Sequence, residues 1–332
     1  MTAGLARVGV IGGGAWGTAL AALAAENGEA VLWARNDDVV AMINRDHANA
    51  LYLPDVTLPA ALRATSAFAA LKDCDALLLA VPAQSLRSFG DRIADELPGA
   101  APLVIASKGI EIATGRLPAE VLAETLPGRA LAILTGPNFA AEIARGLPAA
   151  ATLACADAAL GAALVQRLGR PTFRPYFSDD VTGAQVGGAV KNVLAIACGI
   201  VIGRRLGDNA RAALITRGLA EMTRLGLSLG AKRETLTGLS GLGDLVLTCS
   251  GPQSRNLSLG IALGEGRILQ EVLAARRSIA EGVYTAQAIG ALAARQGVEM
   301  PICEAVDAIL HRGASIDEAL QALLSRPFRA ET

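Results

Sequence analysis

Only four of the 30 basic residues are lysines, and two of the four lie where an amine could act as an acid or a base. Lys191 lies in the segment GGAVKNVLAIACG, among small and apolar residues. Burial disfavours a charged ammonium group, so we expect the pKa of Lys191 to fall into the range useful for proton transfer. We also expect Gly187 and Gly188 to leave room for a ligand beside it. The alternative is a lysine whose stem lies on a helix surface with its amine in water.

A second lysine and one carboxylate are the expected partners of Lys191. Lys108 follows the apolar run 103–106, and the carboxyl ends of parallel strands face the ligand crevice of a doubly wound sheet. Asp244 stands in a glycine-rich, uncharged loop, GLSGLGDLVLTCSG, where a carboxylate could orient a lysine or bind a hydroxyl group. The alternatives are a loop lysine in solvent and an aspartate that caps the following helix.

A phosphate site is predicted at Ser254, Arg255 and Asn256. The arginine fork can hold a phosphate with two hydrogen bonds, and the hydroxyl and amide groups beside it can add further ones. A surface helix cap is the alternative for this tripeptide. The two histidines, His47 and His311, lie in settings typical of structural or surface residues, so we expect the proton donor to be a lysine. No cluster of carboxylates, histidines or cysteines has the spacing of metal ligands.

The stretch GGGAWG at 12–17 predicts a dinucleotide site, because it fits G-x-G-x-x-G between an expected strand and an expected helix. Gly12 would permit the tight turn, Gly14 would let the backbone approach a pyrophosphate, and Gly17 would let the helix pack against the strand. Arg35 follows the second expected strand, where NAD enzymes usually carry an acidic residue. A cation there can bind a 2′-phosphate, so we expect NADPH to be accepted. The alternative is a solvated arginine that stacks on adenine.

These residues need a sheet and a set of helices to bring them together. In the first half, short apolar runs alternate with helical stretches, which predicts a Rossmann-type α/β domain with a doubly wound parallel sheet over residues 1–180. From about Asp179, long segments with helical spacing predict an all-α domain over residues 181–332. We expect the active site in the crevice between the two domains.

The expected elements can be given by residue number. The expected strands are 8–11, 30–33, 76–81, 103–106, 130–134, 149–153 and 172–176, and the first expected helix is 15–27. The expected helices of the second domain are 182–203, 208–229, 232–239, 255–264, 268–274, 283–297, 302–311 and 315–325.

The bulk composition favours a globular protein without a nucleic-acid partner. An apolar fraction of 52% and a formal net charge of −1 argue against disorder and give no attraction to nucleic acid. The five cysteines form no CxxC, so we expect buried thiols in a reducing cytosol. The uncharged stretches 8–25 and 193–203 are explained by a glycine turn and by a buried core helix. We therefore expect no signal peptide and no membrane insertion.

Together these segments resemble the bacterial NAD(P)-dependent glycerol-3-phosphate dehydrogenase family along nearly the whole chain. The matching segments are GGGAWGTALA at 12–21, NALYLPDVTLP at 49–59, ASKGIE at 106–111, TGPNFAAEIARGLP at 135–148, GAQVGGAVKNVLAIACGI at 183–200, NARAALITRGLAEMTRLG at 209–226, GLGDLVLTC at 241–249, SRN at 254–256 and AEGVYTA at 280–286. The GGAVKN and LITRGLAEM segments alone would separate this family from other two-domain dehydrogenases.

The resemblance implies hydride transfer between NAD(P)H and dihydroxyacetone phosphate, giving sn-glycerol 3-phosphate for glycerophospholipid synthesis. It implies Lys191 as the proton donor and Asp244 as the second catalytic residue. The implied substrate-binding residues are Lys108, Gly136, Asn138, Lys191, Asp244, Ser254, Arg255 and Asn256. The implied cofactor-binding residues are Gly12, Gly14, Ala15, Trp16, Gly17, Arg35, Lys108, Ala140, Arg255, Ile279 and Glu281. Ala15 stands where many relatives carry serine, Asn138 where others carry threonine or serine, and Ser107 where threonine is common. None of the three replaces a proposed catalytic group.

Both NADPH/NADP and NADH/NAD are expected cofactors, a phosphorylated triose is the expected small-molecule partner, and the expected location is the cytoplasm. The oligomeric state stays open, with a homodimer as one alternative. A related two-domain reductase for a 3-hydroxyacid or ketopantoate is the competing enzyme, and the SRN and GLGD segments argue against it. A dinucleotide-sensing protein without turnover is the competing non-enzyme, and the predicted pairing of Lys191 with Asp244 argues against it.

Overall fold

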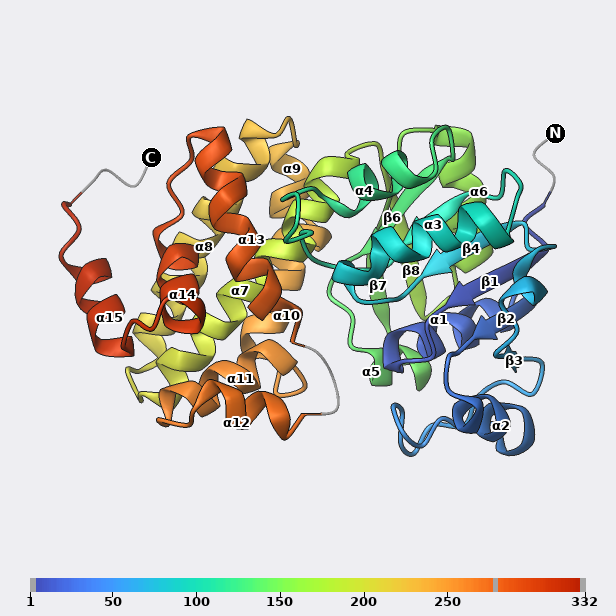
Figure 1. Cartoon of the computed structure of the whole chain (residues 1–332), viewed down its shortest axis with the longest axis horizontal. Helices are drawn as coiled ribbons and strands as arrows, with labels where there is room; N and C mark the ends of the chain where they lie inside the picture. The colour runs from blue at the N-terminus through green and yellow to red at the C-terminus, as the bar shows by residue number, and fades with distance from the viewer. Residues whose placement is uncertain (1–3, 277–279, 329–332) are drawn as a thin grey trace.

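The structure is a computed structural model that describes residues 4–276 and 280–328, and Figure 1 shows a sheet domain beside a helical domain. The sheet has eight strands in the order β3-β2-β1-β4-β5-β6-β7-β8. They are β1 (Arg7–Ile11), β2 (Glu29–Trp33), β3 (Arg63–Thr65), β4 (Ala76–Leu79), β5 (Leu103–Ile105), β6 (Leu131–Thr135), β7 (Ala149–Cys155) and β8 (Phe173–Ser178). This confirms the prediction of a Rossmann-type sheet, with one added strand, β3, whose sequence RAT has no apolar run.

The sheet differs from the expected parallel arrangement at one junction. Neighbouring strands are parallel everywhere except between β6 and β7, which pair antiparallel. The connection between these two strands contains the five-residue helix α5 (Ala140–Ala144). A strand parallel to β6 would have to start at the opposite edge of the sheet, which needs a longer crossover connection. The chain instead begins β7 at the edge where β6 ends, so the segment between them stays at that edge.

Helices cover both faces of the sheet, as a doubly wound fold requires. One face packs against α1 (Ala15–Ala25), α2 (Asp37–Asp46), α5 and α6 (Ala158–Leu168), and its core contains Leu20, Leu32 and Leu78. The other face packs against η1 (Phe68–Leu71), α3 (Leu86–Glu96) and α4 (Pro118–Thr125), and η2 (Ala83–Ser85) leads into α3. The central strands β4 and β5 are buried on both faces, and they read as continuous apolar runs in the sequence.

A buried arginine ties α6 to the first strand-helix-strand unit. Arg167 is 8% exposed, and its guanidinium donates to the backbone oxygens of Leu5 at 2.6 Å, Ala24 at 2.7 Å and Glu29 at 2.9 Å. These oxygens belong to the entry to β1, the end of α1 and the start of β2. One side chain therefore satisfies carbonyl groups from three segments that the sheet brings together.

The helical domain is built around α7 (Val181–Gly203), in which every residue from Gly183 to Val201 is buried. The helices around it are α8 (Asp208–Ser228), α9 (Arg233–Thr237), α10 (Asp244–Ser250), α11 (Arg255–Gly264), α12 (Leu269–Ala274), α13 (Glu281–Gln296), α14 (Pro301–His311) and α15 (Ile316–Leu324). α7 is apolar and long enough to cross a membrane by length and composition, but 89% of its apolar window is buried inside the protein. This agrees with the prediction of a core helix at 193–203.

The close approach of α7 and α11 depends on glycine. A Cβ atom at Gly199 would collide with the carbonyl oxygen of Leu257, and one at Gly260 would collide with the carbonyl oxygen of Ile196. The two backbones therefore touch directly. This contact fixes the first turn of α11, which carries the predicted phosphate-binding tripeptide, relative to Lys191 on α7.

The structure corrects the prediction for residues 232–250. The expected helix 232–239 is shorter, a π-helical turn η3 (Leu239–Gly243) follows it, and Asp244 begins α10 rather than lying in a loop. The glycines here serve close packing, because a Cβ at Gly187 of α7 would collide with the carbonyl oxygen of Ser240. The expected ligand space beside Lys191 is likewise filled by protein: a Cβ at Gly188 would lie 2.9 Å from Oγ1 of Thr135.

The cysteines and histidines have structural settings. The five cysteines are all buried free thiols, as expected. His311 lies 2.9 Å through Nε2 from the carbonyl oxygen of Val283, which fits a structural role, and His47 ends α2 in the left-handed conformation.

Candidate active site

Three charged side chains meet between the two domains. Asp244 at the start of α10 accepts a hydrogen bond from Nζ of Lys191 on α7 at 2.7 Å. Its other carboxylate oxygen accepts from Nζ of Lys108, which follows β5, at 2.6 Å. Nζ of Lys108 also donates to the carbonyl oxygen of Gly136 at 3.0 Å. The three residues that the sequence proposed as partners therefore form one cluster, to which the sheet domain contributes Lys108 and Gly136.

The cluster is shielded from water. The side chains of Asp244, Lys191 and Lys108 are 1%, 9% and 16% exposed. Desolvation lowers the pKa of Lys191 to about 8, and the charge of Asp244 opposes this decrease. An amine with this pKa can release and recover a proton near neutral pH, which is what a general acid and base needs. This agrees with the expectation for Lys191 and argues against a solvated surface lysine.

The local backbone explains why Asp244 reaches Lys191. The π-helical turn before α10 packs against α7 at Gly187, and such turns are frequent at functional sites. Thr248, one turn further along α10, accepts a hydrogen bond from Nζ of Lys191 at 2.8 Å and contacts Asp244 at 3.3 Å. Thr248 was not predicted as a site residue. Its spacing of four from Asp244 would have indicated a shared helix face if α10 had been predicted.

The segment TGPNFA contributes polar groups that have no partner among the described residues. Oδ1 and Nδ2 of Asn138 are buried without a hydrogen bond there, and so is Oγ1 of Thr135. Gly136 between them has a φ of 138°. Buried polar atoms are nearly always paired, so their lack of protein partners favours contact with water or a ligand. Thr135 was not predicted, whereas Gly136 and Asn138 were.

Two residues of the predicted phosphate-binding tripeptide, Ser254 and Asn256, make hydrogen bonds within the protein, whereas Arg255 is exposed. Oγ of Ser254 accepts from the backbone N–H of Leu257 at 3.2 Å, so it caps α11, which was the alternative for this segment. Nδ2 of Asn256 donates to Oδ1 of Asn192 at 2.9 Å, and its Oδ1 accepts from the backbone of Gly282 at 3.1 Å.

Arg255, the first residue of α11, is exposed. Burial raises the pKa of Glu281, the first residue of α13, to about 7, and the positive charge of Arg255 opposes this increase. Oε1 of Glu281 accepts from the backbone N–H of Ala83 in the sheet domain at 3.2 Å. This second region of the domain interface therefore has an exposed guanidinium and a carboxyl group that reaches across to η2.

The glycine turn fits a dinucleotide. Gly12 has a φ of 122°, and a Cβ there would lie 2.5 Å from the carbonyl oxygen of Ala80. A Cβ at Gly17 would collide with the carbonyl oxygen of Gly12, so α1 can approach β1 only with glycine here. Gly14 is the N-cap of α1, and nothing lies within 4 Å of its Cβ position. Free space in front of a helix N-terminus is where a pyrophosphate binds.

The other predicted cofactor residues are more dispersed. Ala15 and Trp16 begin α1, and Nε1 of Trp16 is buried without a partner among the described residues. Ala140 begins α5. Arg35 is exposed just after β2, and β1 and β4 separate that strand from β5, which precedes Lys108. Ile279 lies outside the described residues.

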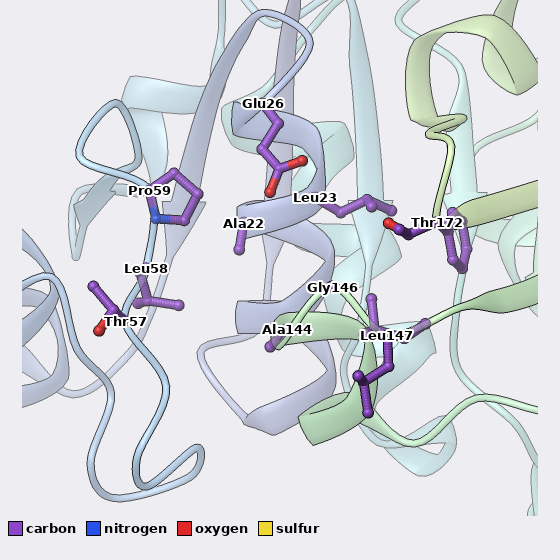
Figure 2. Close-up of a pocket in the computed structure, with 12 residues that line it drawn as sticks. Ala22, Leu23, Glu26, Thr57, Leu58, Pro59, Ala144, Gly146, Leu147 and Thr172 are labelled. Atoms are coloured by element: carbon purple, nitrogen blue, oxygen red, sulfur yellow. The ribbon is translucent and has the colours of Figure 1, made fainter.

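A separate cavity of about 340 Å³ lies beside α1 and is not part of this cluster. Figure 2 shows Thr57, Leu58 and Pro59 on one side of it, with Ala22 of α1 and Leu147 on the others. It includes none of the predicted site residues. No three His, Cys, Asp or Glu side chains of the described chain are placed to hold a metal ion.

A glycine turn on a Rossmann-type sheet, together with a buried Lys–Asp pair on a helical domain that Lys108 joins to this sheet, defines the class of two-domain nicotinamide-dependent dehydrogenases. Comparison with known proteins gives the family. The model of the NAD-dependent glycerol-3-phosphate dehydrogenase N-terminus matches residues 7–161, and that of the C-terminus matches residues 180–321. The chain belongs to this family.

Two relatives and one solved structure illustrate the similarity. The glycerol-3-phosphate dehydrogenase [NAD(P)+] of Parvibaculum lavamentivorans is 56% identical over 100% of both chains. The protein of the same name from Caulobacter vibrioides is 55% identical over 98% of each chain. The crystal structure of glycerol-3-phosphate dehydrogenase from Coxiella burnetii is 40% identical, has a TM-score of 0.92, and is matched over 96% of this chain and 99% of that chain.

Proposed function

We propose that this chain reduces dihydroxyacetone phosphate to sn-glycerol 3-phosphate with NADPH or NADH and catalyses the reverse oxidation. The observation that carries the proposal is the buried Lys191–Asp244 pair, 2.7 Å apart, at the interface between the helical domain and the sheet domain that bears the glycine turn. Family membership and relatives named glycerol-3-phosphate dehydrogenase [NAD(P)+] support the choice of substrate.

In the proposed mechanism Lys191 gives its proton to the ketone oxygen during reduction and takes a proton from the alcohol during oxidation. A nicotinamide cofactor held at the glycine turn would supply the hydride for reduction and accept it for oxidation. Asp244 holds the amine of Lys191 in place and partly offsets the desolvation that lowers its pKa. Lys108, within the same cluster, places a second positive charge where the carbonyl oxygen becomes negative, which is the usual way to stabilise such a transition state.

We assign substrate binding to residues around this cluster. Gly136 contacts Lys108 through its carbonyl oxygen, and Asn138 offers two buried amide atoms without partners among the described residues. Arg255 is the proposed phosphate ligand because its guanidinium is exposed at the first turn of α11. Ser254 and Asn256 belong to this substrate site in the proposal and fix the turn that carries Arg255.

The cofactor is assigned to the glycine turn and its surroundings. The residues are Gly12, Gly14, Ala15, Trp16, Gly17, Arg35, Lys108, Ala140, Arg255 and Glu281, together with Ile279, which lies outside the described residues. Arg35 would bind the 2′-phosphate of NADPH from its exposed position after β2.

The remaining proposals concern the setting of the reaction. We place the domain boundary at 180/181, between β8 and α7. We propose a cytoplasmic enzyme that supplies glycerol 3-phosphate for glycerophospholipid synthesis and has neither nucleic acid nor membrane as a partner. A homodimer is the assembly to test by light scattering.

A steady-state assay tests the proposed function. The purified chain is given NADPH or NADH with dihydroxyacetone phosphate, dihydroxyacetone or ketopantoate, and absorbance at the nicotinamide band is followed. We expect oxidation of both reduced cofactors with the phosphorylated ketone and much lower kcat/KM with the other two. Turnover that favours ketopantoate, or no turnover with any ketone, would contradict the proposal.

A further inference from the structure

The glycine turn contains the Gly13–Gly14 peptide group, and the backbone of two glycines does not by itself fix the orientation of that group. Gly12, Gly13 and Gly14 are consecutive, and residues without Cβ rotate freely about their backbone bonds. In a trans peptide, the C=O of Gly13 and the N–H of Gly14 point in opposite directions. The orientation of this one peptide therefore decides whether a donor or an acceptor faces an anion in front of α1.

A side chain from another segment holds the carbonyl end of this peptide. Asn49 is 0% exposed, and its Nδ2 donates to the carbonyl oxygen of Gly13 at 3.1 Å and to Oγ1 of Thr18 at 2.8 Å. Oγ1 of Thr18 in turn lies 3.5 Å from the same carbonyl oxygen. The reversed amide would place Oδ1 of Asn49 against that oxygen, so the donor must face Gly13. The carbonyl group is thus directed into the protein.

The space beside Gly14 is open, whereas Gly13 is closely packed. A Cβ at Gly13 would lie 2.5 Å from Cβ of Ala34, so this residue is packed against the chain that follows β2. Nothing lies within 4 Å of the Cβ position of Gly14. With the Gly13 carbonyl held by Asn49, the N–H of Gly14 points away from Asn49.

The segment that carries Asn49 is itself fixed. The backbone carbonyl oxygen of Asn49 accepts hydrogen bonds from the backbone N–H groups of Tyr52 at 3.1 Å and Leu53 at 2.7 Å. Leu53, Val56 and Leu58 are buried in the core that includes α1, and Figure 2 shows Leu58 beside that helix. Asn49 is therefore anchored by apolar burial on one side and bound to the glycine turn on the other.

We propose that Asn49 is a positioning residue of the cofactor site, which fixes the Gly13–Gly14 peptide so that the N–H of Gly14 faces the pyrophosphate. Thr18 assists through its hydroxyl group. The inference rests on the proposed function, because it requires that the turn binds NAD(P)H. Asn49 is the first residue of the NALYLPDVTLP segment, which resembles the family but to which no chemical role was assigned from the sequence.

The test measures binding rather than activity. NADPH, ADP-ribose and adenosine 2′-monophosphate are titrated into wild type, Asn49→Ala and Thr18→Val by calorimetry. The first two ligands contain the pyrophosphate and the third does not. We expect Asn49→Ala to weaken NADPH and ADP-ribose about ten- to hundredfold, the range for a lost hydrogen bond to a charged group, and to change adenosine 2′-monophosphate less than about twofold. Thr18→Val should change affinity in the same direction by a smaller factor.

Asn44→Ala is the matched control. Asn44 donates to the carbonyl oxygen of Ala64 at 2.8 Å and accepts from its N–H at 2.9 Å, so it joins α2 to β3 away from the glycine turn. This variant should melt at a lower temperature and bind all three ligands as wild type does. Unchanged NADPH affinity in Asn49→Ala, or an equal loss for all three ligands, would overturn the inference.

Two further outcomes are separable. If Asn49→Ala does not fold, Thr18→Val decides, and wild-type affinity for ADP-ribose in that variant would overturn the role of the contact. If wild type itself binds no NADPH, the proposed function fails, and with it the premise of this inference.

Discussion

Lys191 and Asp244 form a buried ion pair in which Nζ lies 2.7 Å from Oδ1, and the second oxygen of the same carboxylate binds Lys108 from the other domain. One carboxylate therefore holds two ammonium groups at the domain interface. The arrangement keeps Lys191 close to the sheet domain and leaves its pKa near 8.

Replacing Lys191 with methionine removes the proposed proton donor while keeping most of the side-chain volume. We expect kcat for ketone reduction to fall about 10²- to 10⁴-fold, the usual contribution of a general acid, with NADPH affinity changed less than about threefold. Lys232→Met is the control, because Lys232 pairs with Asp179 at the surface, where the two side chains are 54% and 62% exposed. A kcat within threefold of wild type for Lys191→Met would exclude this donor.

Replacing Asp244 with asparagine should change the pH dependence of the reaction. The charge of Asp244 raises the pKa of Lys191 against desolvation, so its removal should lower that pKa below about 8. Reduction needs the protonated amine, and activity is lost as pH rises through the pKa. The basic limb of the kcat profile should therefore move to lower pH in Asp244→Asn. If the basic limb of the kcat profile stays at the same pH while kcat falls, a group other than Lys191 determines that limb.

Replacing Arg255 with alanine should weaken recognition of the phosphate. We expect KM for dihydroxyacetone phosphate to rise about tenfold or more, the effect of losing a charge-assisted pair. Measured at saturating NADPH, so that the proposed contact of Arg255 with the cofactor does not limit the rate, the kcat/KM for unphosphorylated dihydroxyacetone should change little, which distinguishes phosphate binding from general damage to α11. Equal losses for both ketones would contradict the assignment.

Replacing Arg35 with aspartate should shift cofactor preference towards NADH. Arg35 is exposed after β2, so its loss should not affect folding. A carboxylate repels the 2′-phosphate of NADPH and can accept from a free 2′-hydroxyl. We expect KM for NADPH to rise about tenfold or more while KM for NADH stays the same or falls. Near-equal NADPH affinity in wild type and variant would refute the role of Arg35.

Glu221 should make stability depend on pH. This buried carboxyl accepts from the backbone N–H groups of Ile302 at 2.7 Å and Cys303 at 3.2 Å, and burial raises its pKa to about 7 from the ordinary 4.5. The folded state therefore binds a proton more tightly than the unfolded chain. Protonation of Glu221 therefore adds up to about 3 kcal/mol to the free energy of unfolding. This contribution is fully present below pH 4.5 and is lost as the pH rises through 7.

The variant Glu221→Gln keeps an acceptor for α14 and removes the titration. The decrease in melting temperature between pH 5.5 and 7.5 should be smaller in this variant than in wild type. Glu318→Gln is the control, because the pKa of Glu318 is lowered below 4.5 by its bonds to Ser315 and it stays ionised throughout this range. An equal decrease in all three proteins would show that other groups dominate.

Sequence patterns predicted the architecture because burial leaves a strong local signal. β4 and β5 are apolar throughout, β1 carries no polar side chain after Arg7, and the glycine turn has a fixed spacing. The three residues of β3 lack this signal because the strand lies at the sheet edge. The antiparallel β6–β7 pair depends on how α5 turns, which no local pattern encodes.

The site was predicted where residue chemistry is distinctive and missed where it depends on distant packing. The burial of Lys191 follows from its own neighbours in the sequence. α10 was missed because its leading glycines indicate a loop unless the partner helix α7, about fifty residues earlier, is known. Thr248 was missed with α10, and the hydrogen bond of Asn49 to Gly13 joins residues 36 positions apart.

The guanidinium of Arg167 has a consequence for biosynthesis. It binds Leu5, 162 residues earlier in the chain, and Ala24, 143 residues earlier. During translation the ribosome must therefore release α6 before the carbonyl groups around the first βαβ unit find their partner. At about 5–20 residues per second, that unit waits roughly 7 to 30 seconds before the guanidinium of Arg167 can bind it. The amino-terminal segment is synthesised first but completes its packing late, so nascent chains shorter than α6 should depend on chaperones.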